Sequence, residues 1–303
     1  DYNGAQQDGA FLYQVTHKNG ERCSAAKGYL TPHLNRPNLK VITRAVTAKI
    51  DVQNHRATGV QFYQGNQLQT VRARREVVVS AGAFGSPQLL QLSGIGAAQD
   101  LQKLGIAITH DLPGVGQNLQ DHIDYVQSWS VPSNTASFGV SLRGTGKALG
   151  AMLEWRKQRS GMITSAIASA GAFFKSHPDV TVPDLQLVFV LAQVDDHARK
   201  QHLGHGISCH VDVLRPYSRG TVGLQSTDPR VAPVIDPRFL SDDRDVQLLL
   251  KGGRVQQRLI ESSAFAPVRG KMMYPVHADD ARAMEQDIRN RADTQYHPVG
   301  TCK

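Results

Sequence analysis

Residues 75–96 read REVVVSAGAFGSPQLLQLSGIG, and this stretch decides the fold. Residues 76–80 form a short apolar run rich in β-branched side chains, which is typical of a strand covered on both faces. Gly82 and Gly85 follow closely, and glycine lets a backbone turn sharply and approach another group. The stretch therefore predicts a buried strand and a tight turn against which a cofactor can lie.

A short helix is expected directly after this turn. Ser86 stands where an N-cap residue belongs, and Pro87 suits the first helical position, where its missing N–H costs nothing. Three leucines between positions 89 and 92 supply an apolar stripe, and Ser93 with Gly94 predicts the end of the helix. The stretch thus predicts a strand, a glycine turn and a helix in immediate succession.

Apolar spacing and turn residues predict the other elements of the chain. Strands are expected at 11–16, 39–43, 47–50, 57–63, 67–74, 106–110, 185–192 and 207–214. Helices are expected at 25–34, 98–104, 147–159, 244–262 and 278–292. Gly65 and Asn66 predict a hairpin turn, and Asp242 and Asp279 are the expected helix caps. Residues 128–143 are rich in Ser, Thr, Asn and Gly without periodicity, which predicts a loop or lid between domains.

The strand expected at 207–214 alternates between apolar and polar side chains. Its apolar face carries Ile207, Cys209, Val211 and Val213, and its polar face carries Ser208, His210 and Asp212. Alternation with a period of two residues is typical of a strand with one face in the core and one in solvent. A half-buried antiparallel sheet is therefore expected.

Composition and charge place the chain among globular proteins. Its 303 residues are 40% hydrophobic and 20% charged, an ordinary balance for a soluble protein that can hold two domains. No stretch approaches the roughly 18 uninterrupted apolar residues of a membrane-spanning helix, and the first residues do not resemble a signal peptide. The net charge is +8, but the one tight basic cluster, at 72–75, fits a solvated strand end, so no nucleic-acid partner is expected.

Neither the cysteines nor the histidines predict a metal site. Cys23, Cys209 and Cys302 lie far apart and show no C-x-x-C or zinc-binding spacing. His197, His202 and His205 are irregularly spaced in an expected surface loop. Unpaired cysteines also favour a reduced, cytoplasmic setting.

Four more segments carry distinctive motifs. They are LPGVGQNLQDH at 112–122, LRPYSRGT at 214–221, IDP at 235–237 and YHPVGTCK at 296–303. Together with residues 82–96, these segments resemble the glucose-methanol-choline (GMC) oxidoreductases, FAD enzymes that oxidise alcohols. The resemblance covers the chain nearly end to end and is strongest for the choline dehydrogenase and aliphatic-alcohol dehydrogenase branch.

The resemblance implies a fold of the α+β or α/β class. A partial FAD-binding, Rossmann-like domain is expected at 1–127, a substrate domain with an antiparallel sheet backed by helices at 128–292, and the start of the C-terminal FAD-domain segment at 293–303. Family members begin with a strand, a G-x-G-x-x-G turn and a helix that hold the FAD pyrophosphate. This chain has no such turn and stops after HPVGTCK, so we expect an internal fragment of a longer enzyme.

His297 is the expected catalytic residue. Oxidising an alcohol removes a proton from oxygen and a hydride from carbon, so the site needs a base beside the hydroxyl group. Histidine titrates near neutral pH, and in the GMC family the histidine that opens the HPVGTC motif lies at the flavin face. From the residues alone, a histidine before proline is better explained as a simple turn residue, and the resemblance reverses this preference in favour of the catalytic role.

The resemblance also implies which residues contact FAD. Thr47, with Val46 as the one-residue alternative, aligns with the position whose backbone N–H and C=O recognise the adenine edge. Ala81 and Gly82 belong to the glycine turn beside the cofactor. Without the resemblance, Thr47 would be an ordinary strand residue, because backbone recognition leaves no mark on side-chain identity.

Asn118 and Asp121 are expected to pack or to form hydrogen bonds on the flavin side. His122, which follows directly, is expected to be structural. His210 on the polar strand face could point into a substrate cavity, although a hydrogen-bonded sheet histidine is the commoner arrangement.

The expected function is hydride transfer from the CH–OH group of a primary alcohol to FAD, which yields an aldehyde. Choline and aliphatic alcohols both stay open as substrates, because aromatic residues make up only 6% of the chain and form no recognisable box for a quaternary ammonium group. Without the pyrophosphate turn, the fragment itself is expected to lack FAD and to be inactive.

Two alternative functions are a hydroxynitrile-lyase-like member of the same fold, which keeps FAD without using its redox power, and a non-catalytic basic binding module. For the parent enzyme, the resemblance implies a small-molecule alcohol as partner and a peripheral membrane association with quinone or another electron acceptor. A cytoplasmic location, or one peripheral to the inner membrane, is expected.

Overall fold

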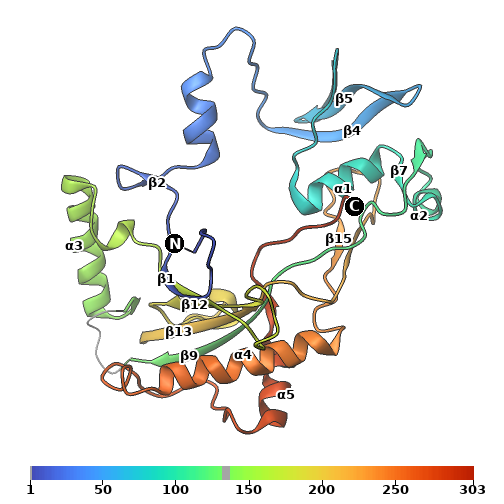
Figure 1. The fold of residues 1–303 in the computed structure, drawn as a ribbon. Coiled ribbons are helices and arrows are strands. Elements are labelled where there is room, and N and C mark those ends of the chain that lie inside the picture. Colours follow the sequence, from blue (N-terminus) through green and yellow to red (C-terminus); the bar gives the residue numbers. More distant parts are fainter. Residues whose placement is uncertain (1, 132–136) are drawn as a thin grey trace. The chain divides into compact units, whose positions relative to one another are not determined.

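A computed structural model describes residues 2–131 and 137–303. These residues form two compact units, each assembled from separate stretches of sequence (Figure 1). Unit 1 contains Asp1–Leu39, His122–Arg215 and Asp242–Gln295, and unit 2 contains Lys40–Asp121, Pro216–Ser241 and Tyr296–Lys303. The units interleave along the chain, whereas the sequence led us to expect three consecutive segments. The assignment of those segments to cofactor and substrate domains stays a prediction.

An antiparallel sheet of seven strands forms the core of unit 1. Its order is β1-β11-β12-β13-β9-β16, and β10 pairs with β13 beside this path. The strands are β1 (Gly9–Leu12), β9 (Ile123–Ser130), β10 (Gly139–Val140), β11 (Ala168–Phe174), β12 (Leu185–Val190), β13 (Gly204–Val213) and β16 (Asp293–Thr294). The strands expected at 185–192 and 207–214, and their antiparallel pairing, are confirmed by β12 and β13.

β13 lies in the middle of this sheet and packs against helix α4 (Asp243–Glu261) on one face (Figure 1). This face carries Cys209 and Val211, which are fully buried. A Cβ atom at Gly252 would lie 2.4 Å from Val211 Cγ2, so only glycine lets the helix approach the strand this closely. The apolar face of β13 therefore forms the core as expected.

The polar face of β13 is also covered, so the expected half-buried sheet is wrong. Ser208 Oγ donates to Ala192 O at 2.7 Å and accepts from Val194 N at 2.8 Å, which holds the segment after β12 across this face. His210 and Asp212 on the same face are buried with Ser208. Polar side chains tolerate burial when protein groups replace the hydrogen bonds of water.

Helices α4 and α5 (Ala281–Arg291) confirm the helices expected at 244–262 and 278–292. Asp242 caps α4 as expected, since its carboxylate accepts from Arg244 N at 3.0 Å. The expected cap at Asp279 is wrong by one residue, because it is Asp280 that reaches Ala283 N, at 2.9 Å. Across residues 2–131 and 137–303, no helix combines the length and apolar character needed to span a bilayer.

Helix α3 (Leu142–Gln158) begins earlier than the helix expected at 147–159. Ser141 caps it, with its hydroxyl accepting from Gly144 N at 3.0 Å. A loop or lid was expected at 128–143. This prediction is wrong at both ends of the range, because β9 extends to Ser130 and α3 begins at Leu142. Its central residues, 132–136, lie outside the described residues. The turns η3 (Met162–Thr164) and η4 (Asp196–Ala198) complete this part of unit 1.

The first residues of unit 1 form short elements. They are β2 (His17–Lys18), β3 (Glu21–Arg22), a π-helix η1 (Ala26–Leu30) and a 3₁₀ turn η2 (Thr31–His33). The helical structure expected at 25–34 is therefore confirmed in this irregular form. The strand expected at 11–16 forms earlier, as β1, which pairs with β11 at the sheet edge.

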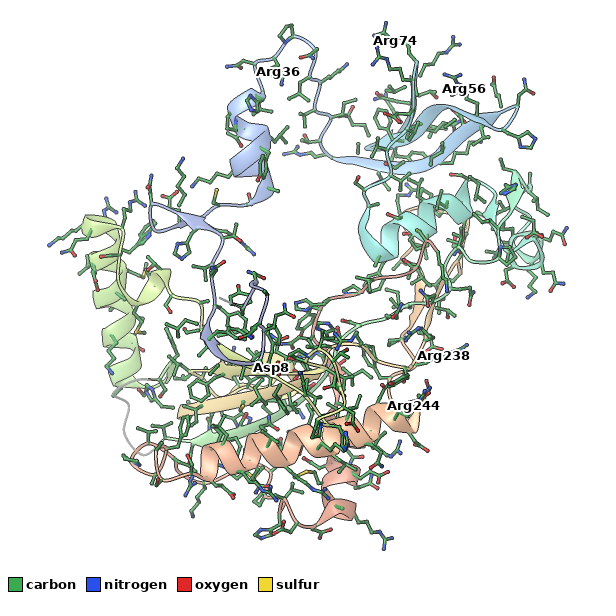
Figure 2. The ribbon with its side chains drawn as sticks, in the orientation of Figure 1. Asp8, Arg36, Arg56, Arg74, Arg238 and Arg244 are labelled. Carbon is green, nitrogen blue, oxygen red and sulfur yellow. The ribbon has the colours of Figure 1, made fainter. Side chains whose placement is uncertain are left out.

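Unit 2 contains a three-stranded antiparallel sheet of β4 (Ala45–Gln53), β5 (Arg56–Gln64) and β6 (Gln67–Arg72). The hairpin expected across Gly65 and Asn66 is confirmed. The other elements are α1 (Gly82–Leu92), β7 (Ile95–Gly96), α2 (Ala98–Lys103), β8 (His110–Asp111), β14 (Thr221–Gly223) and β15 (Val234–Asp236). Figure 2 labels Arg56 on β5 and Arg74 on the segment that follows β6, and the basic residues at 72–75 are exposed.

Residues 76–80 do not form the expected buried strand. No described strand pairs with them, and Val78 is largely exposed. A strand needs a neighbour that accepts and donates its backbone hydrogen bonds, and apolar composition alone does not supply one. For the same reason, residues 39–43 are not a strand, and only β8 forms near 106–110.

Candidate functional site

The loop Tyr296–Lys303 carries the expected catalytic histidine and contacts residues 115–121 within unit 2. His297 N donates to Asp121 Oδ1 at 2.9 Å. Two backbone hydrogen bonds between Gln120 and Val299, at 2.8 and 3.0 Å, join the same segments. Asp121 is buried, whereas His297 is exposed. The chain thus fixes the backbone of His297 while its side chain remains accessible.

Asn118 holds the next part of the loop. Its Nδ2 donates to Gly300 O at 3.1 Å. Gly300 has a φ of +92°, and a Cβ there would lie 2.5 Å from Asn118 O, so both conformation and space require glycine. The structure therefore brings Asn118, Asp121 and His297 together in one cluster. Their contact with a flavin stays a prediction.

Thr301 connects this loop to helix α1. Pro87 lies inside α1, where it has no N–H to donate to the carbonyl of Ala83, one turn earlier. The Thr301 hydroxyl donates to Ala83 O at 2.5 Å and satisfies that carbonyl. Sequence reasoning missed Thr301. A proline in the middle of an apolar helix is the signal that could have indicated an outside donor.

Helix α1 begins before the expected N-cap, so the expected capping role of Ser86 is wrong. The helix begins at Gly82 after Ala81, and Ser86 Oγ accepts from Ala81 N at 3.1 Å from inside the helix. Gly82 has a φ of +76°, and apart from its chain neighbours and the helix's own backbone, no atom lies within 4 Å of a Cβ built there. Among the described residues, this end of the 11-residue helix is therefore open to an approaching group.

Thr47 and Val46 lie on β4, an edge strand of the unit 2 sheet, and both are exposed. The strand register shifts between Thr47 and Lys49, which marks a bulge. Along an edge strand, half of the backbone groups point away from the partner strand, and Ser93 Oγ accepts one of them, Ile50 N, at 2.8 Å. The site of Thr47 thus suits recognition by backbone atoms. The adenine contact itself stays a prediction.

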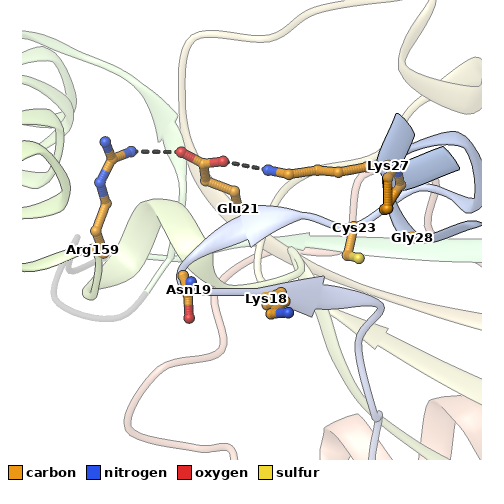
Figure 3. Close-up of a pocket in the computed structure, with 8 residues that line it drawn as sticks. Lys18, Asn19, Glu21, Cys23, Lys27, Gly28 and Arg159 are labelled. Carbon is orange, nitrogen blue, oxygen red and sulfur yellow. Dashed lines mark hydrogen bonds and ion pairs between the residues drawn. The ribbon is translucent and has the colours of Figure 1, made fainter. Parts of the chain in front are cut away.

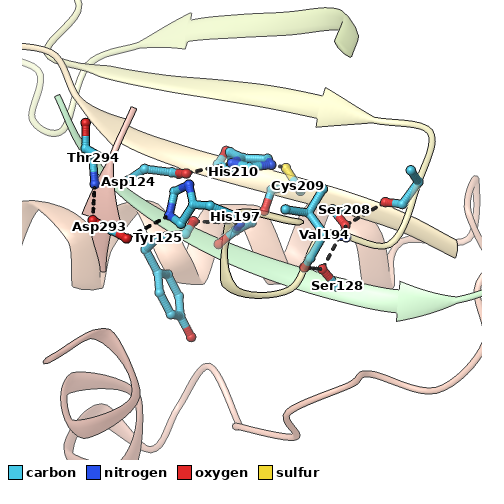
Figure 4. A network of polar contacts seen from close by, with 12 residues as sticks. Asp124, Tyr125, Ser128, Val194, His197, Ser208, Cys209, His210, Asp293 and Thr294 are labelled. Atoms are coloured by element: carbon cyan, nitrogen blue, oxygen red, sulfur yellow. Dashed lines mark hydrogen bonds and ion pairs between the residues drawn. The ribbon is translucent and has the colours of Figure 1, made fainter. Parts of the chain in front are cut away.

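His210 forms a buried pair with Asp124 in the unit 1 sheet (Figure 4). Its Nδ1 donates to Asp124 Oδ2 at 2.7 Å, and the two residues are 7% and 0% exposed. His210 Nε2 and Asp124 Oδ1 have no hydrogen-bond partner among the described residues. Burial, with the charges of Asp124 and Asp212, raises the pKa of the neighbouring Cys209 thiol, so this cysteine stays protonated. The pair fits a structural role, and sequence reasoning missed Asp124.

His202 and His197 lie near different carboxylates of unit 1. His202 Nε2 is 2.7 Å from Asp195 Oδ2, and Tyr274 donates to the same oxygen at 3.0 Å. Burial alone would raise the pKa of Asp195, but these two hydrogen bonds outweigh it and lower the pKa. His197 lies 3.9 Å from Asp293 (Figure 4). The two histidines therefore belong to separate contacts.

His205 is buried at the start of β13, so its expected place on a surface loop is wrong. The carbonyl oxygen of His122 accepts from Gln295 N at 3.0 Å, which fits the structural role expected for that residue. Within the part of the chain that the structure describes, no three His, Cys, Asp or Glu side chains are grouped to hold a metal ion.

A hollow of about 600 Å³ lies among the short N-terminal elements of unit 1 (Figure 3). Glu21 forms ion pairs there with Lys27 and with Arg159. The hydrogen bond from Lys27 lowers the pKa of Glu21, so the carboxylate stays ionised between the two cations. Exposed ion pairs of this kind contribute little to stability, and we assign the hollow no catalytic role.

Two models of the GMC oxidoreductase family match this chain, one over residues 1–124 and the other over residues 216–303. The alcohol dehydrogenase (acceptor) of Pseudomonas putida is 40% identical over 308 residues, which cover 100% of this chain and 55% of that protein. The mitochondrial choline dehydrogenase of Mus musculus is 38% identical over 100% of this chain and 51% of that protein. The chain spans about half the length of the curated relatives that it matches.

Solved structures agree with this match. A formate oxidase of Aspergillus oryzae, studied for modification of its FAD, superposes with a TM-score of 0.88 at 26% identity, over 99% of this chain and 56% of that one. A pyridoxine 4-oxidase superposes with a TM-score of 0.84 at 22% identity, over 100% and 55%. The expected α+β fold is confirmed. Since the two family models together match more than half of its residues, the chain belongs to the GMC oxidoreductase family.

Proposed function

We propose that this chain is part of an FAD-dependent enzyme that oxidises the CH–OH group of a primary alcohol to an aldehyde. The observation that carries the proposal is the 2.9 Å hydrogen bond from His297 N to Asp121, which fixes the HPVGTC motif beside Asn118. Two relatives of the chain are named as alcohol and choline dehydrogenases, which supports an alcohol as the substrate.

The residues of unit 2 fit an FAD cofactor at two places. The open N-terminus of α1 at Ala81 and Gly82 suits an electron-rich group, because backbone N–H groups and the positive end of the helix dipole meet there. The edge strand at Thr47 suits recognition of a heterocycle by backbone atoms. When bound, FAD supplies the acceptor for the hydride that leaves the alcohol carbon.

His297 is proposed to accept the proton of the alcohol hydroxyl. An imidazole takes up and releases protons near neutral pH, as a general base requires. Asp121 holds the His297 backbone, and the contact between Asn118 and Gly300 holds the loop beyond it. The loop is therefore ordered before substrate binds, which reduces the entropy lost in positioning the base.

The choice between choline and an aliphatic alcohol stays open. A quaternary ammonium group is recognised by aromatic faces around it. Unit 1 gathers the rings of Tyr2, Phe11, Tyr13 and Phe173, with centroid distances of 4.5 to 6.4 Å, but these rings pack against one another. They form an aromatic cluster and not an empty cage, so they favour neither substrate.

The experiment that tests the proposal uses the full-length parent enzyme with flavin bound. Anaerobic addition of octanol or choline should bleach the flavin absorbance and release the matching aldehyde in equal amount. A flavin that stays oxidised while a cyanohydrin is cleaved would favour the lyase alternative. A protein that does neither and shifts nucleic acid in a salt-dependent manner would favour the basic binding module.

We further propose that the 303-residue chain alone neither retains FAD nor turns over alcohol. Its sequence contains no G-x-G-x-x-G turn to bind the pyrophosphate. Protein purified in the presence of excess FAD and then desalted should be colourless. A stoichiometric flavin spectrum would contradict this and would mean that the contacts at Ala81, Gly82 and Thr47 suffice.

A peripheral contact of the parent enzyme with an anionic membrane is proposed through α3. Leu142, Leu149 and Leu153 share one side of this helix and are 95%, 59% and 60% exposed. Arg156 and Lys157 follow in its last turn, and an apolar stripe beside cations is typical of helices that lie in a bilayer interface. Phosphatidylglycerol vesicles should sediment the wild type but not Leu149→Glu, and neutral vesicles should sediment neither. The electron acceptor and the cytoplasmic location stay predictions.

A further inference from the structure

A cavity of about 900 Å³ lies in unit 2 beside the three-stranded sheet of β4, β5 and β6. Its volume falls within the range typical of small-molecule sites. All of its lining residues lie between Lys49 and Thr109, so the cavity belongs to unit 2 alone. None of them has a part in the proposed alcohol oxidation, and the cavity therefore needs a separate explanation.

One face of the sheet forms a wall of this cavity. Residues opposite each other on neighbouring strands, and residues two apart along one strand, point to the same face. The register thus places two rows on one face, Lys49, Gln61 and Thr70 in the first and Asp51, Gly59 and Arg72 in the second. All six residues line the cavity, so this polar face of the sheet is directed toward it.

Three cations line the cavity and form no ion pair with any described residue. They are Lys49 on β4, Arg72 at the end of β6 and Arg74 just beyond it, and all three are exposed. Other cations of unit 2 do pair with carboxylates, namely Lys103 with Asp100, Arg230 with Asp228 and Arg238 with Asp236. The cations of the cavity are therefore available to an anionic ligand.

Asp51 is the one carboxylate among the described residues that line the cavity. Its Oδ1 accepts from Gln61 Nε2 at 2.7 Å. Three cations against one carboxylate give the lining a net positive charge, and a hollow lined mainly by one sign of charge attracts ligands of the other. The cavity therefore favours an anion with more than a single charge.

A phosphate group fits this charge better than a carboxylate does. A phosphate monoester carries a charge of about −1.5 to −2 near neutral pH, whereas a carboxylate carries one negative charge. The guanidinium groups of Arg72 and Arg74 present forked donors that match phosphate oxygens, and an ammonium group such as that of Lys49 adds a compact positive charge. Charge and donor type together favour phosphate.

The cavity also has an apolar part. Val52, Leu92 and Ile106 line it and are half-buried, so part of their surface remains open. Covering this surface with an apolar group of a ligand would stabilise the complex, because apolar area is removed from water. A phosphate attached to an apolar organic group therefore fits the cavity better than inorganic phosphate.

We propose that this cavity binds a small phosphate monoester with an apolar organic group. The phosphate oxygens accept hydrogen bonds from Lys49, Arg72 and Arg74, and the organic group lies against Val52, Leu92 and Ile106. This inference does not depend on the proposed alcohol oxidation, because it requires neither flavin nor His297.

The first test is isothermal titration of the 303-residue chain with phenyl phosphate at constant ionic strength. Arg72→Gln should weaken binding at least about tenfold, because it removes a charged donor. Lys40→Gln is the control, since Lys40 is an exposed residue of unit 2 outside the cavity and its loss changes the net charge equally. No saturable binding to the wild type, or the same loss in both variants, would overturn the proposal.

Asp51→Asn provides a test of opposite sign. Asparagine keeps an oxygen that accepts from Gln61 but removes the negative charge, so phenyl phosphate should bind about twofold to fivefold more tightly. Asp100→Asn, at an exposed carboxylate outside the cavity, should leave the affinity unchanged. An Asp51→Asn chain that binds no more tightly than the wild type would contradict the proposal, and this variant also decides the matter if Arg72→Gln fails to fold.

The chemical class and source of the ligand are tested with further probes. Benzoate, which has the same ring but one charge, and inorganic phosphate, which has no ring, should both bind more weakly than phenyl phosphate. Equal affinity for phenyl phosphate and benzoate would show that the phosphate assignment is wrong. Phosphatidylglycerol vesicles should sediment the wild type and Arg72→Gln equally. Vesicles or an oligonucleotide that bind through Arg72, with no binding of phenyl phosphate, would replace the soluble ligand by a membrane surface or a nucleic acid.

Discussion

The loop Tyr296–Lys303 and the strand β13 each contain a histidine that is bound by an aspartate. The aspartate binds the backbone of the histidine in the loop and the ring of the histidine in the strand. In the loop, Asp121 binds the backbone N–H of His297, and the side chain is exposed. In the strand, Asp124 binds the ring of His210, and the side chain is buried. The first arrangement leaves an imidazole accessible to a substrate, whereas the second uses the imidazole as a hydrogen-bond donor to a buried carboxylate.

The difference shows why residue type alone does not identify a base. The loop is held by main-chain hydrogen bonds and by the Thr301 hydroxyl, and the His297 side chain lies at the exposed surface. In β13 the side chains of Ser208 and His210 are themselves the contacts that make a polar sheet face compatible with burial. We therefore expect substitution of His297 to lower the catalytic rate and substitution of His210 to lower the stability of the fold.

The largest effect is expected for His297→Ala in the full-length parent enzyme. Removing a general base should lower kcat by about 10²–10⁴-fold, or roughly 3–5 kcal/mol of barrier, while flavin content is unchanged. The measurement is the rate of flavin reduction under anaerobic alcohol, and His210→Ala serves as the control that should change kcat far less. A His297→Ala enzyme that reduces its flavin as fast as the wild type would place the base elsewhere.

The next effect is expected for His210→Ala, which leaves Asp124 buried beside Asp212 without its partner. Breaking a buried pair by removing one member should cost about 3–5 kcal/mol of the free energy of unfolding, measured by urea denaturation of the chain. Replacing both members, as in His210→Leu with Asp124→Leu, should cost less than either single change, because no charge then remains without a partner.

His202→Ala provides the matched control for this pair. His202 also contacts a carboxylate at 2.7 Å, but its side chain is 40% exposed, so water replaces the lost contact. The expected loss is at most about 1 kcal/mol. Equal losses for His202→Ala and His210→Ala would show that burial does not distinguish the two pairs.

A smaller effect is expected where the loop contacts α1. Thr301→Val keeps the shape of the side chain but leaves the Ala83 carbonyl without its donor, because Pro87 has no N–H to offer. The free energy of unfolding should fall by about 1–3 kcal/mol, and hydrogen exchange in α1 should become faster. Thr70→Val on the exposed surface of β6 is the control and should cost nothing measurable. Unchanged exchange in α1 would mean that water satisfies Ala83.

Much of the fold followed from local signals. The Gly65-Asn66 turn indicated the hairpin, and alternation over 207–214 indicated β13 and its pairing. Burial of the polar face of β13 could not be predicted, because Asp124, which pairs with His210, lies 86 residues away along the chain. A row of Ser, His and Asp looks like a solvated face until the groups that cover it are known.

Prediction of the candidate site from the sequence was limited in the same way. The motifs indicated His297, Asn118 and Asp121 as separate site residues, and the contacts that join them appear only in the structure. The predicted start of α1 was wrong because its proline was interpreted as a helix start. That proline lies inside α1 while Thr301, 218 residues away from Ala83, donates to the exposed carbonyl. The strand expected at 76–80 failed for a related reason, since strand pairing depends on a neighbour that local composition does not reveal.

The smallest effect is expected at Asp242, a carboxylate held at the surface instead of inside the sheet. It caps α4, and its hydrogen bonds with Arg244 lower its pKa to about 2, below the value of about 3.9 for an unfolded chain. A lowered pKa means that the ionised form stabilises the fold, fully above about pH 4, and that this stabilisation is lost as the pH falls toward about 2. Between pH 5 and pH 2, the free energy of unfolding should therefore fall less steeply for Asp242→Asn, which caps without charge, than for the wild type or for Asp279→Asn. The free energy of unfolding is measured by urea denaturation at each pH. If it falls with pH equally in all three proteins, this surface carboxylate, unlike Asp124, contributes nothing through its charge.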